Sequence, residues 1–571
     1  MLRTKIDDMI DLIKKNKIVN YKIIAKTLSW DEDSVERIAL GLEKAGLAAT
    51  HYSINLIEKP TITLMKKDGE QEEEQFKQKP IEEYPVMDQA KTNIATVSIF
   101  HSEQERRPAY HITLPNISEY TRAYVDMVKA EVAREAKSVI DENMQDFELR
   151  KSLVQKIIER DLKPEKKESD LLVRIVLNEM YGLGEIEALI SDSRLEEIVI
   201  NAANLPVSVY HRKHGWLKTN ISMKNEENTE NYAEQIARKV GRQISLLNPI
   251  LDAHLSTGDR VNATLFPIST RGNTITLRLF ARNPWTMVSY LKKEQNAMSV
   301  EMAAFLWQAL HYEMNIIVAG GTASGKTSAL NGMLALMPPF QRIVTIEDTR
   351  ELMLPSYQWN WVPLVTRMPN PEGLGEVTML DLVVNALRMR PDRIVMGEIR
   401  RKREAEVLFE AMHTGHSVYA TMHADTGTQV IKRLIDPPIE VPSSEVEDVN
   451  LLLIQYRDRR RNIRRTLEIS EVVPGVEMPE LNRIYTWKPR TDTFQMVKVP
   501  HKHIEKMNLH TGMTEKEVMD DQMDKMEVLK WMAKNNLDDI DSVGKVMQIY
   551  YSETDEVVSA AKKGLNPSKV M

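Results

Sequence analysis

The chain has 571 residues, a net charge of −7 and no cysteine, which excludes disulfides and cysteine-ligated zinc or iron–sulfur sites. The negative charge weighs against nucleic acid as the main partner, because phosphate binding needs concentrated Lys and Arg. There is no run of eighteen apolar residues and no signal peptide, so we expect a chain that neither spans a membrane nor is exported by itself.

Residues 1–67 are predicted to form a small head of three helices and a β-hairpin, an order that resembles a winged helix. A winged helix suggests DNA binding. However, the third helix, at 31–45, carries five acidic residues against only Arg37 and Lys44, and such a face would repel phosphate. A protein-docking module is therefore favoured, with DNA binding and a purely structural role as alternatives.

Two regions are expected to join this head to the rest of the chain. Residues 68–117 open with an acidic, polar run at 68–83, which is typical of a solvated linker, so the whole region is interpreted as an acidic linker. Residues 118–169 have a helical pattern of mixed charge that breaks at Pro164, which predicts a helical connector.

Three further domains follow. Alternating strand and helix patterns over 170–283 predict a compact α/β domain, with a hinge at 281–285. Residues 284–500 are expected to form a nucleotide-binding domain, and 501–571 a helical tail. The apolar stripe of that tail is more typical of packing than of a partner groove; it comprises Met523, Met526, Leu529 and Met532.

Residues 320–327 (GGTASGKT) fit the pattern G-x-x-x-x-G-K-[ST] between an apolar run and a helical segment. A strand, a glycine loop and a helix in this order cradle phosphate with backbone N–H groups and the positive end of the helix. Lys326 would reach the β- and γ-phosphates, and the Thr327 hydroxyl would bind Mg²⁺. The residues expected to contact a nucleoside triphosphate are Gly320, Gly321, Thr322, Ala323, Ser324, Gly325, Lys326, Thr327 and Ser328.

Three polar stretches follow apolar runs downstream of this loop. Glu347 and Asp348 end the first run, Glu398 follows the second, and His416 and His423 bracket the third. In an open parallel sheet such strand ends lie beside the phosphate loop, where water or Mg²⁺ would be held. An N-cap pair and a core histidine are the alternatives for single residues, but the whole set in this order favours nucleotide chemistry.

Two further metal hypotheses are weaker. Asp392 precedes the second run and is expected to cap the start of that strand rather than to bind metal. Zinc bound by His413, His416 and His423 is an alternative, but neither an H-E-x-x-H motif nor a cysteine supports it.

These stretches resemble the motifs of the secretion-superfamily ATPases, which power type II and type IV secretion, type IV pili and archaella. The similar segments are 345–352 (aspartate box), 396–400 (Walker B), 414–425 (histidine box), and 258–263 and 277–280 (the N-domain segments that bring arginines to the nucleotide). The resemblance covers about residues 170–500 and rests on several motifs in a fixed order.

The resemblance implies roles for five residues. Glu347 would activate the attacking water, Glu398 would hold Mg²⁺ through water, and His423 would monitor the γ-phosphate. Arg260 and Arg278 would neutralise charge that develops on the phosphoryl group.

One departure from the family pattern concerns the arginines. A second arginine often follows the one in the later N-domain segment, but Leu279 occupies that place here, which leaves open how many arginines act. The fold expected from the resemblance is a RecA-like P-loop ATPase domain preceded by a smaller α/β N-domain, with a winged-helix-like head and a helical tail. Nucleotide would bind between the two motor domains, so their closure would couple hydrolysis to motion.

The resemblance also implies a machine and its partners. We expect a Mg²⁺-dependent ATPase, a cytoplasmic homohexamer docked on a polytopic membrane platform, which powers assembly or export of pilin-like subunits. Bacterial type II and pilus-extension members usually carry a four-cysteine metal module, which this chain lacks. That difference and the long tail with 531–536 (WMAKNN) point to archaeal members.

A cluster of arginines at 457–465 (RDRRRNIRR) leaves alternatives open. We interpret it as a charged hairpin turn, with contact to anionic lipid or to nucleic acid as alternatives. It is also the sole sequence support for the rival function, a nucleic-acid translocase or DNA-binding ATPase that would use the winged-helix-like head.

Overall fold

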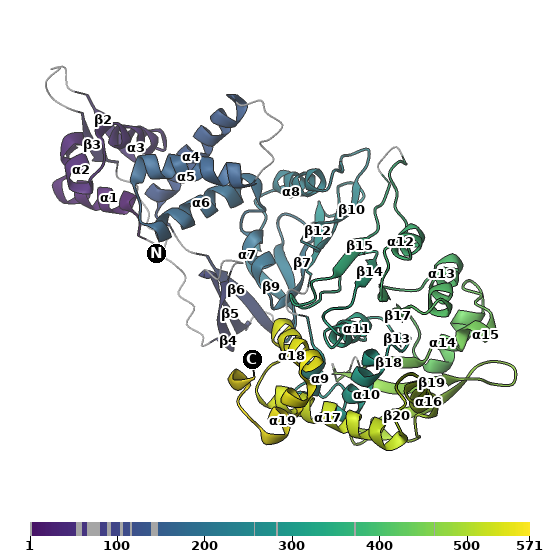
Figure 1. The fold of residues 1–571 in the computed structure, drawn as a ribbon. Coiled ribbons are helices and arrows are strands. Elements are labelled where there is room, and N and C mark those ends of the chain that lie inside the picture. Colours follow the sequence, from purple (N-terminus) through teal and green to yellow (C-terminus); the bar gives the residue numbers. More distant parts are fainter. Residues whose placement is uncertain are drawn as a thin grey trace. The chain divides into compact units, whose positions relative to one another are not determined.

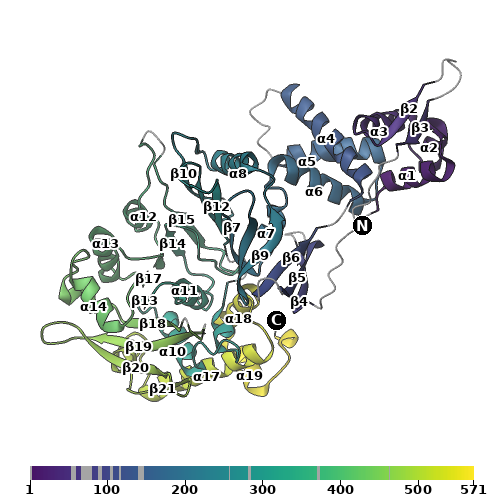
Figure 2. The same cartoon turned by 180° about the vertical axis from the view of Figure 1, so that it is seen from behind.

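The computed structural model of the chain describes residues 3–52, 60–65, 80–87, 93–102, 107–114, 117–138, 147–255, 257–280, 284–369, 373–458, 460–461 and 463–570. The chain divides into two compact units, whose elements are labelled in Figures 1 and 2. The first unit comprises Met1–Leu255 and Arg260–Leu279, and the second Ser256–Asp259 and Phe280–Met571. Each contains a large sheet with helices packed on it, so the predicted α/β class is confirmed.

The first unit begins with helices α1 (Lys5–Asn16), α2 (Tyr21–Leu28) and α3 (Glu32–Lys44). Strands β1 (Val19–Asn20), β2 (Ala48–His51) and β3 (Thr61–Leu64) form an antiparallel sheet in the order β1-β3-β2. The Asp31 side chain accepts a hydrogen bond from the Ser34 N–H and so caps α3, as its position in the sequence predicts. Strand β1 was not expected, since two residues are too few to show periodicity.

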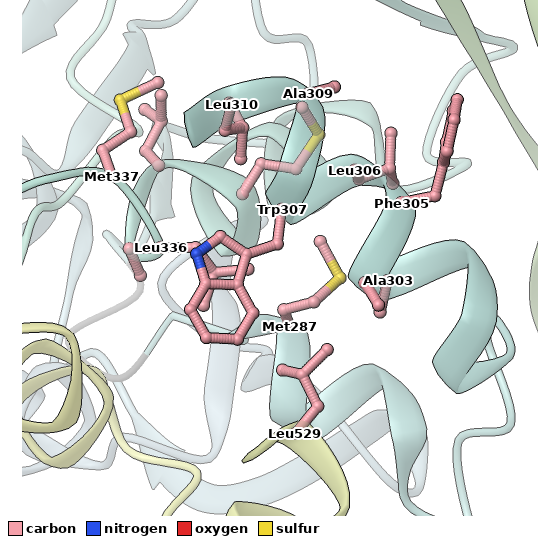
Figure 3. Packing of buried hydrophobic residues seen from close by; sticks show 14 of the residues in the cluster. Met287, Ala303, Phe305, Leu306, Trp307, Ala309, Leu310, Leu336, Met337 and Leu529 are labelled. Atoms are coloured by element: carbon pink, nitrogen blue, oxygen red, sulfur yellow. The ribbon is translucent and has the colours of Figure 1, made fainter. Parts of the chain in front are cut away.

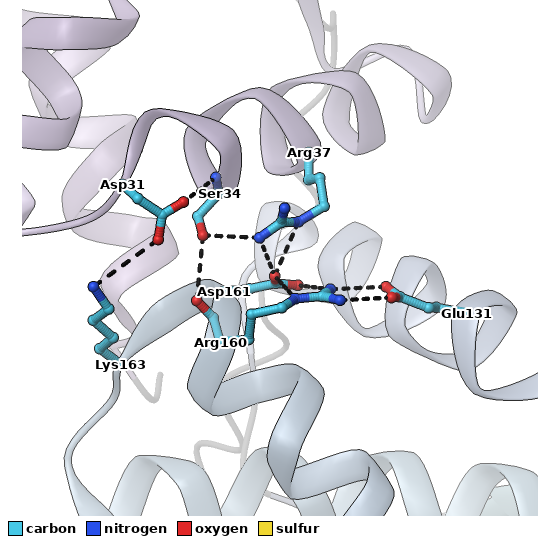
Figure 4. A network of polar contacts seen from close by, with 7 residues as sticks. All are labelled: Asp31, Ser34, Arg37, Glu131, Arg160, Asp161 and Lys163. Carbon is cyan, nitrogen blue, oxygen red and sulfur yellow. Dashed lines mark hydrogen bonds and ion pairs between the residues drawn. The ribbon is translucent and has the colours of Figure 1, made fainter. Parts of the chain in front are cut away.

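Helices α4 (Glu119–Ser138), α5 (Phe147–Leu162) and α6 (Lys166–Tyr181) share one hydrophobic cluster with α1–α3. Helix α6 crosses the predicted boundary at 169/170, so the helical connector continues to Tyr181. A polar network joins α3 to α4 and α5 (Figure 4). The buried Asp161 carboxylate accepts hydrogen bonds from Arg37 Nη2 and from Arg160 Nε, both at 2.8 Å, and Arg160 also pairs with Glu131. Helix α3 is therefore fixed against the connector by both apolar and charged contacts.

The large sheet of the first unit has nine strands in the described residues. In spatial order they are β10 (Ile250–His254), β11 (Arg260–Thr264), β12 (Thr274–Arg278), β7 (Leu195–Ile200), β8 (Pro206–His211), β9 (Gly215–Ser222), β6 (Arg107–Thr113), β5 (Asn93–Ser102) and β4 (Glu82–Met87). Helix α7 (Ile186–Ser191) and helix α8 (Glu226–Lys239) contribute to its apolar core.

Strands β4, β5 and β6 correct the expectation of a linker over 68–117. They extend the sheet of the α/β domain, and alternate residues such as Tyr84 and Val86 are buried in its core. The period of two is present in the sequence, but the acidic run beside it is more typical of a linker; the part of that run at 68–79 lies outside the described residues. Glu82 belongs to the strand and pairs with Arg194 at 2.6 Å and His214 at 2.9 Å.

The sheet of the second unit also has nine strands in the described residues. Their order is β15 (Trp361–Val365), β14 (Ile343–Glu347), β16 (Arg393–Met396), β17 (Ser417–Met422), β13 (Ile316–Gly320), β18 (Leu451–Asp458), β19 (Ile463–Val473), β20 (Glu480–Lys488) and β21 (Thr493–Met496). Neighbours from β15 to β18 are parallel, and those from β18 to β21 are antiparallel.

Both faces of this sheet are covered, which explains why its strands read as continuous apolar runs. Ile316 and Val318 of β13 belong to one cluster, and Ile317 and Ala319 to another. Helices α9 (Met287–Leu291), α10 (Val300–His311) and α11 (Lys326–Leu334) lie on the first side. Helices α12 (Met379–Ala386), α13 (Lys402–His413), α14 (Gly427–Ile435) and α15 (Ser443–Val446) lie on the second.

The tail consists of helices α16 (His501–Thr511), α17 (Glu515–Lys534), α18 (Ile540–Ser552) and α19 (Thr554–Lys563), followed by a 3₁₀ turn at Pro567–Lys569. Leu529 and Met532 of the predicted stripe are fully buried, and Leu529 packs near Trp307 and Met287 (Figure 3). Met523 is 53% exposed, so the stripe is a packing surface along part of its length. Within the described residues, no helix combines the length and apolar character needed to cross a bilayer.

Candidate active site

The glycine loop joins β13 to α11 and is shaped by its neighbours. A Cβ atom on Gly320 would lie 2.4 Å from the Gln455 carbonyl oxygen, and one on Gly321 would lie 2.7 Å from an Asp425 carboxylate oxygen. Gly325 has φ +96°, a conformation that other residues rarely adopt. The first and last glycines of the motif are thus required by close packing and by backbone conformation respectively.

The interior of the loop offers polar groups to an anion. Helix α11 begins at Lys326, so the N–H groups of its first turn have no partner within the helix. The Ser324 hydroxyl is buried and has no hydrogen-bond partner among the described residues. Lys326 Nζ donates to the Gly321 carbonyl at 3.2 Å, and burial lowers the pKa of this ammonium group.

Glu347 is the last residue of β14 and is only 2% exposed. Its Oε1 accepts hydrogen bonds from the N–H groups of Glu351 at 2.9 Å and Leu352 at 3.0 Å. Its Oε2 is buried without a partner among the described residues. Burial raises the pKa of Glu347 to about 7, a value suited to a group that takes up a proton near neutral pH.

Glu398 follows β16 and is held by an arginine that the sequence analysis did not single out. Arg400 donates to Glu398 Oε2 from Nε at 2.9 Å and from Nη2 at 2.6 Å, and its Nη1 pairs with Asp348 at 2.6 Å. Arg400 therefore links the carboxylates that follow β14 and β16. The position of Arg400 in the Walker B-like segment, 396–400, is the feature of the sequence that could have identified this residue.

His423 lies beyond β17 and connects Glu398 to the glycine loop. Its Nδ1 is 3.3 Å from Lys326 Nζ, and its Nε2 is 3.5 Å from Glu398 Oε1. Burial, together with the Lys326 charge, lowers the pKa of His423. A neutral ring that accepts at Nδ1 and carries its proton on Nε2 fits both neighbours.

The other two histidines of the zinc hypothesis lie elsewhere. His416 precedes β17, whereas His423 follows it, and six strand residues span roughly 20 Å. His413 pairs instead with Asp448 at 2.9 Å. The described part of the chain contains no cluster of histidine and carboxylate side chains able to hold a metal ion by themselves. Asp392 accepts from the Arg342 N–H at 2.6 Å ahead of β16, as expected of a strand cap.

Arg260 and Arg278 face each other across β11 and β12 of the first unit. Like charges directly opposite each other destabilise a sheet, and here carboxylates offset that cost. Arg260 pairs with Asp252 at 2.8 Å, and Arg278 lies opposite Glu197 on β7. The structure thus brings the two arginines together, while their action on nucleotide stays a prediction.

The arginine cluster lies on the hairpin of β18 and β19. At its turn, Asp458 accepts hydrogen bonds from the N–H groups of Arg460 and Arg461. Arg464, at the start of β19, donates from Nε to the carbonyl of Ala323 in the glycine loop at 3.1 Å. The sequence does not predict this contact, because no local pattern shows that a hairpin returns to a loop 141 residues away.

Comparison with known proteins is consistent with this geometry. Residues 182–454 match the family described as type II/IV secretion system protein. The type IV secretion system protein PtlH of Bordetella pertussis is 30% identical over 284 residues, covering 46% of this chain and 81% of that protein. The chain belongs to the secretion ATPase family. The resemblance deduced from the motifs is thereby confirmed.

The chain is also similar to an uncharacterized protein and to a solved structure. The uncharacterized protein MJ0900 of Methanocaldococcus jannaschii is 36% identical over 332 residues, covering 57% of this chain. The chain spans 59% of the length of that relative. The crystal structure of the VirB11 ATPase from the Brucella suis type IV secretion system aligns at 23% identity with a TM-score of 0.26, covering 50% of this chain and 92% of that one.

Proposed function

We propose that this secretion ATPase hydrolyses ATP and powers assembly or export of pilin-like subunits. One observation carries the proposal. The glycine loop follows one parallel strand and the buried carboxylate of Glu347 ends another strand of the same sheet, at the edge where ligands of such sheets bind, and Glu347 Oε2 has no partner among the described residues. The description of its family and the name of PtlH support type II or type IV secretion as the setting.

The residues of the loop would bind the triphosphate. The first-turn N–H groups of α11 and the buried Ser324 hydroxyl would donate to phosphate oxygens, and Lys326 would turn from the Gly321 carbonyl toward the β- and γ-phosphates. Glu347 would accept a proton from the attacking water, with its Oε1 oriented by two backbone N–H groups.

Thr327 and Glu398 would hold Mg²⁺, the latter through water. They fit this role because Thr327 follows the loop lysine, and Glu398 keeps Oε1 clear of its Arg400 hydrogen bonds. Bound Mg²⁺ would neutralise charge that develops on the phosphates. His423, between Lys326 and Glu398, would sense the γ-phosphate through its two ring nitrogens.

We further propose a homohexamer that docks on a polytopic membrane protein, with the head as a winged-helix-like docking module. The order α1-β1-α2-α3-β2-β3 and the sheet order β1-β3-β2 support that description of the head. Helix α3 weighs against DNA binding, because its Arg37 is engaged by Asp161 and a Cβ atom on its Gly41 would touch the Met127 side chain of α4. The nucleic-acid translocase remains the alternative to be tested.

The deciding experiment measures phosphate release by the wild type and by Glu347→Gln, with and without DNA or anionic lipid vesicles. We expect the substitution to lower turnover about 10²- to 10⁴-fold while nucleotide still binds. Stimulation by vesicles and not by DNA would support a membrane-docked motor. Stimulation by DNA alone would favour the translocase, and full activity of Glu347→Gln would show that another group is the base.

A second measurement addresses assembly. Sedimentation of the chain with ATP and Mg²⁺ should give a species six times the monomer mass if the motor is a homohexamer. A monomer under saturating nucleotide would contradict that part of the proposal.

A further inference from the structure

The segment between β14 and β15 holds the candidate base in place. The N–H groups of Glu351 and Leu352 bind Glu347 Oε1, and the next N–H, that of Met353, donates to Asn331 Oδ1 of α11 at 2.7 Å. The segment therefore touches both the catalytic carboxylate and the helix that follows the glycine loop. The position of this segment depends in turn on the element that packs against its other side.

That support comes from tail helix α18. Ser356 donates to Asp541 Oδ1 from its backbone N–H at 2.9 Å and from its hydroxyl at 2.8 Å. A Cβ atom on Gly544 would lie 2.3 Å from Pro355 Cβ, so the helix approaches the segment as closely as a glycine allows. Leu352 and Leu354 lie in one hydrophobic cluster with tail residues, among them Val543 and Met547.

The tail is itself anchored to the body of the second unit. Thr286 Oγ1 donates to the Asp538 carbonyl at 2.9 Å, and Lys292 pairs with the Asp538 carboxylate at 2.7 Å. Trp307 of α10 donates from its indole nitrogen to the Tyr551 hydroxyl at 3.0 Å. In Figure 3 the Trp307 ring lies among residues of α9, α10 and α17. These contacts make α18 a fixed support.

We propose that α18 positions the catalytic carboxylate, with Asp541 and Gly544 as its positioning residues. They act through residues 351–356 and touch neither the glycine loop nor its lysine in the described structure. The inference rests on the proposed role of Glu347 and goes beyond it by giving the tail a part in turnover. Small displacements of a catalytic group cost rate more than substrate binding, which gives the proposal a distinct kinetic signature.

The test uses the full chain with Asp541→Ala, which removes both Ser356 hydrogen bonds, and Gly544→Ala, which pushes on Pro355. Glu527→Ala is the control, because Glu527 is an exposed tail carboxylate that forms an ion pair with Lys530 on the same helix. For each we would measure kcat, KM for ATP, the melting temperature, and hydrogen exchange of a peptide spanning 349–357. Glu347→Gln is measured alongside.

We expect both α18 variants to lower kcat at least fivefold while KM stays within twofold, and to exchange faster at 349–357. Glu527→Ala should match the wild type in every readout. Unchanged kcat and exchange in both variants, with Glu347→Gln inactive, would overturn the role of the tail alone. A loss of kcat that merely follows a fall in melting temperature and a rise in KM would also overturn it. Full activity of Glu347→Gln would instead overturn the proposed role of Glu347 as the base. Hydrogen exchange at 349–357 in the two α18 variants would still show whether α18 supports that segment.

Discussion

Glu347 joins two environments that act in opposite directions on its proton. Burial favours the neutral acid, and the N–H groups of Glu351 and Leu352 favour the carboxylate. Burial is the larger effect and raises the pKa to about 7. Arg350 and Glu351 lie near enough to add smaller charge effects of opposite sign.

This environment predicts the pH dependence of turnover. Only the carboxylate can accept a proton, so kcat should rise with pH and level off above a midpoint close to 7. The profile is measured between pH 5.5 and 9 at saturating ATP, with nucleotide affinity recorded at the same pH values as control. A kcat that is flat over this range would show that Glu347 does not limit turnover through its protonation.

Arg464 contacts the glycine loop from the hairpin of β18 and β19. Its guanidinium lies against the glycine loop, so it adds positive charge where phosphate is expected to bind. Arg464→Ala should weaken ATP and ADP binding about tenfold, the effect of losing one charge-assisted hydrogen bond. Titration with a fluorescent nucleotide analogue measures both affinities.

Arg461 provides a matched control on the same hairpin. Its side chain pairs with Asp458 at 2.8 Å rather than with the loop, so Arg461→Ala should leave the affinities unchanged. Equal losses in the two variants would point to disruption of the hairpin, and no loss in either would remove Arg464 from the site.

At the level of the elements, the sequence predicts the structure where one local pattern determines it. The glycine loop between β13 and α11 and the polar ends of β14, β16 and β17 could be placed because apolar runs of parallel strands are distinctive. The sequence does not predict the place of an element that depends on a partner far away in the chain. Strands β4–β6 lie far in sequence from β7–β9, with which they share a sheet.

The candidate site divides in the same way into features that the sequence predicts and features that it does not. Lys326, Glu347, Glu398 and His423 follow strands of one sheet edge, so their approximate neighbourhood follows from motif order. The hydrogen bonds and ion pairs that orient these side chains do not follow from the motif order. Arg400 bridges two strand ends, and its place in the Walker B-like segment is the one indication of this in the sequence. Arg464 returns from a hairpin and Asp541 belongs to the tail, and neither contact leaves a periodic or spacing signal.

At the scale of the whole molecule, hydrolysis is expected to need both compact units. The glycine loop and Glu347 belong to the second unit, and Arg260 and Arg278 to the first. Carboxylates offset the mutual repulsion of these two arginines within the sheet, so their predicted action on phosphoryl charge comes from the family resemblance. The second unit should therefore bind nucleotide through its own residues and depend on the first for turnover.

Arg260→Ala and Arg278→Ala test this division of labour. Each should lower kcat by about 10³-fold, the range reported for arginines that stabilise a transferring phosphoryl group, while ADP affinity stays within a few fold of the wild type. Arg238→Ala is the control, because Arg238 is an exposed arginine of the same unit that pairs with Glu234 along α8. Since Leu279 stands where a further arginine often occurs, unequal losses would identify the dominant arginine. Full activity in both variants would mean that the second unit supplies the positive charge itself, and Arg464 and Arg400 would then be the next residues to substitute.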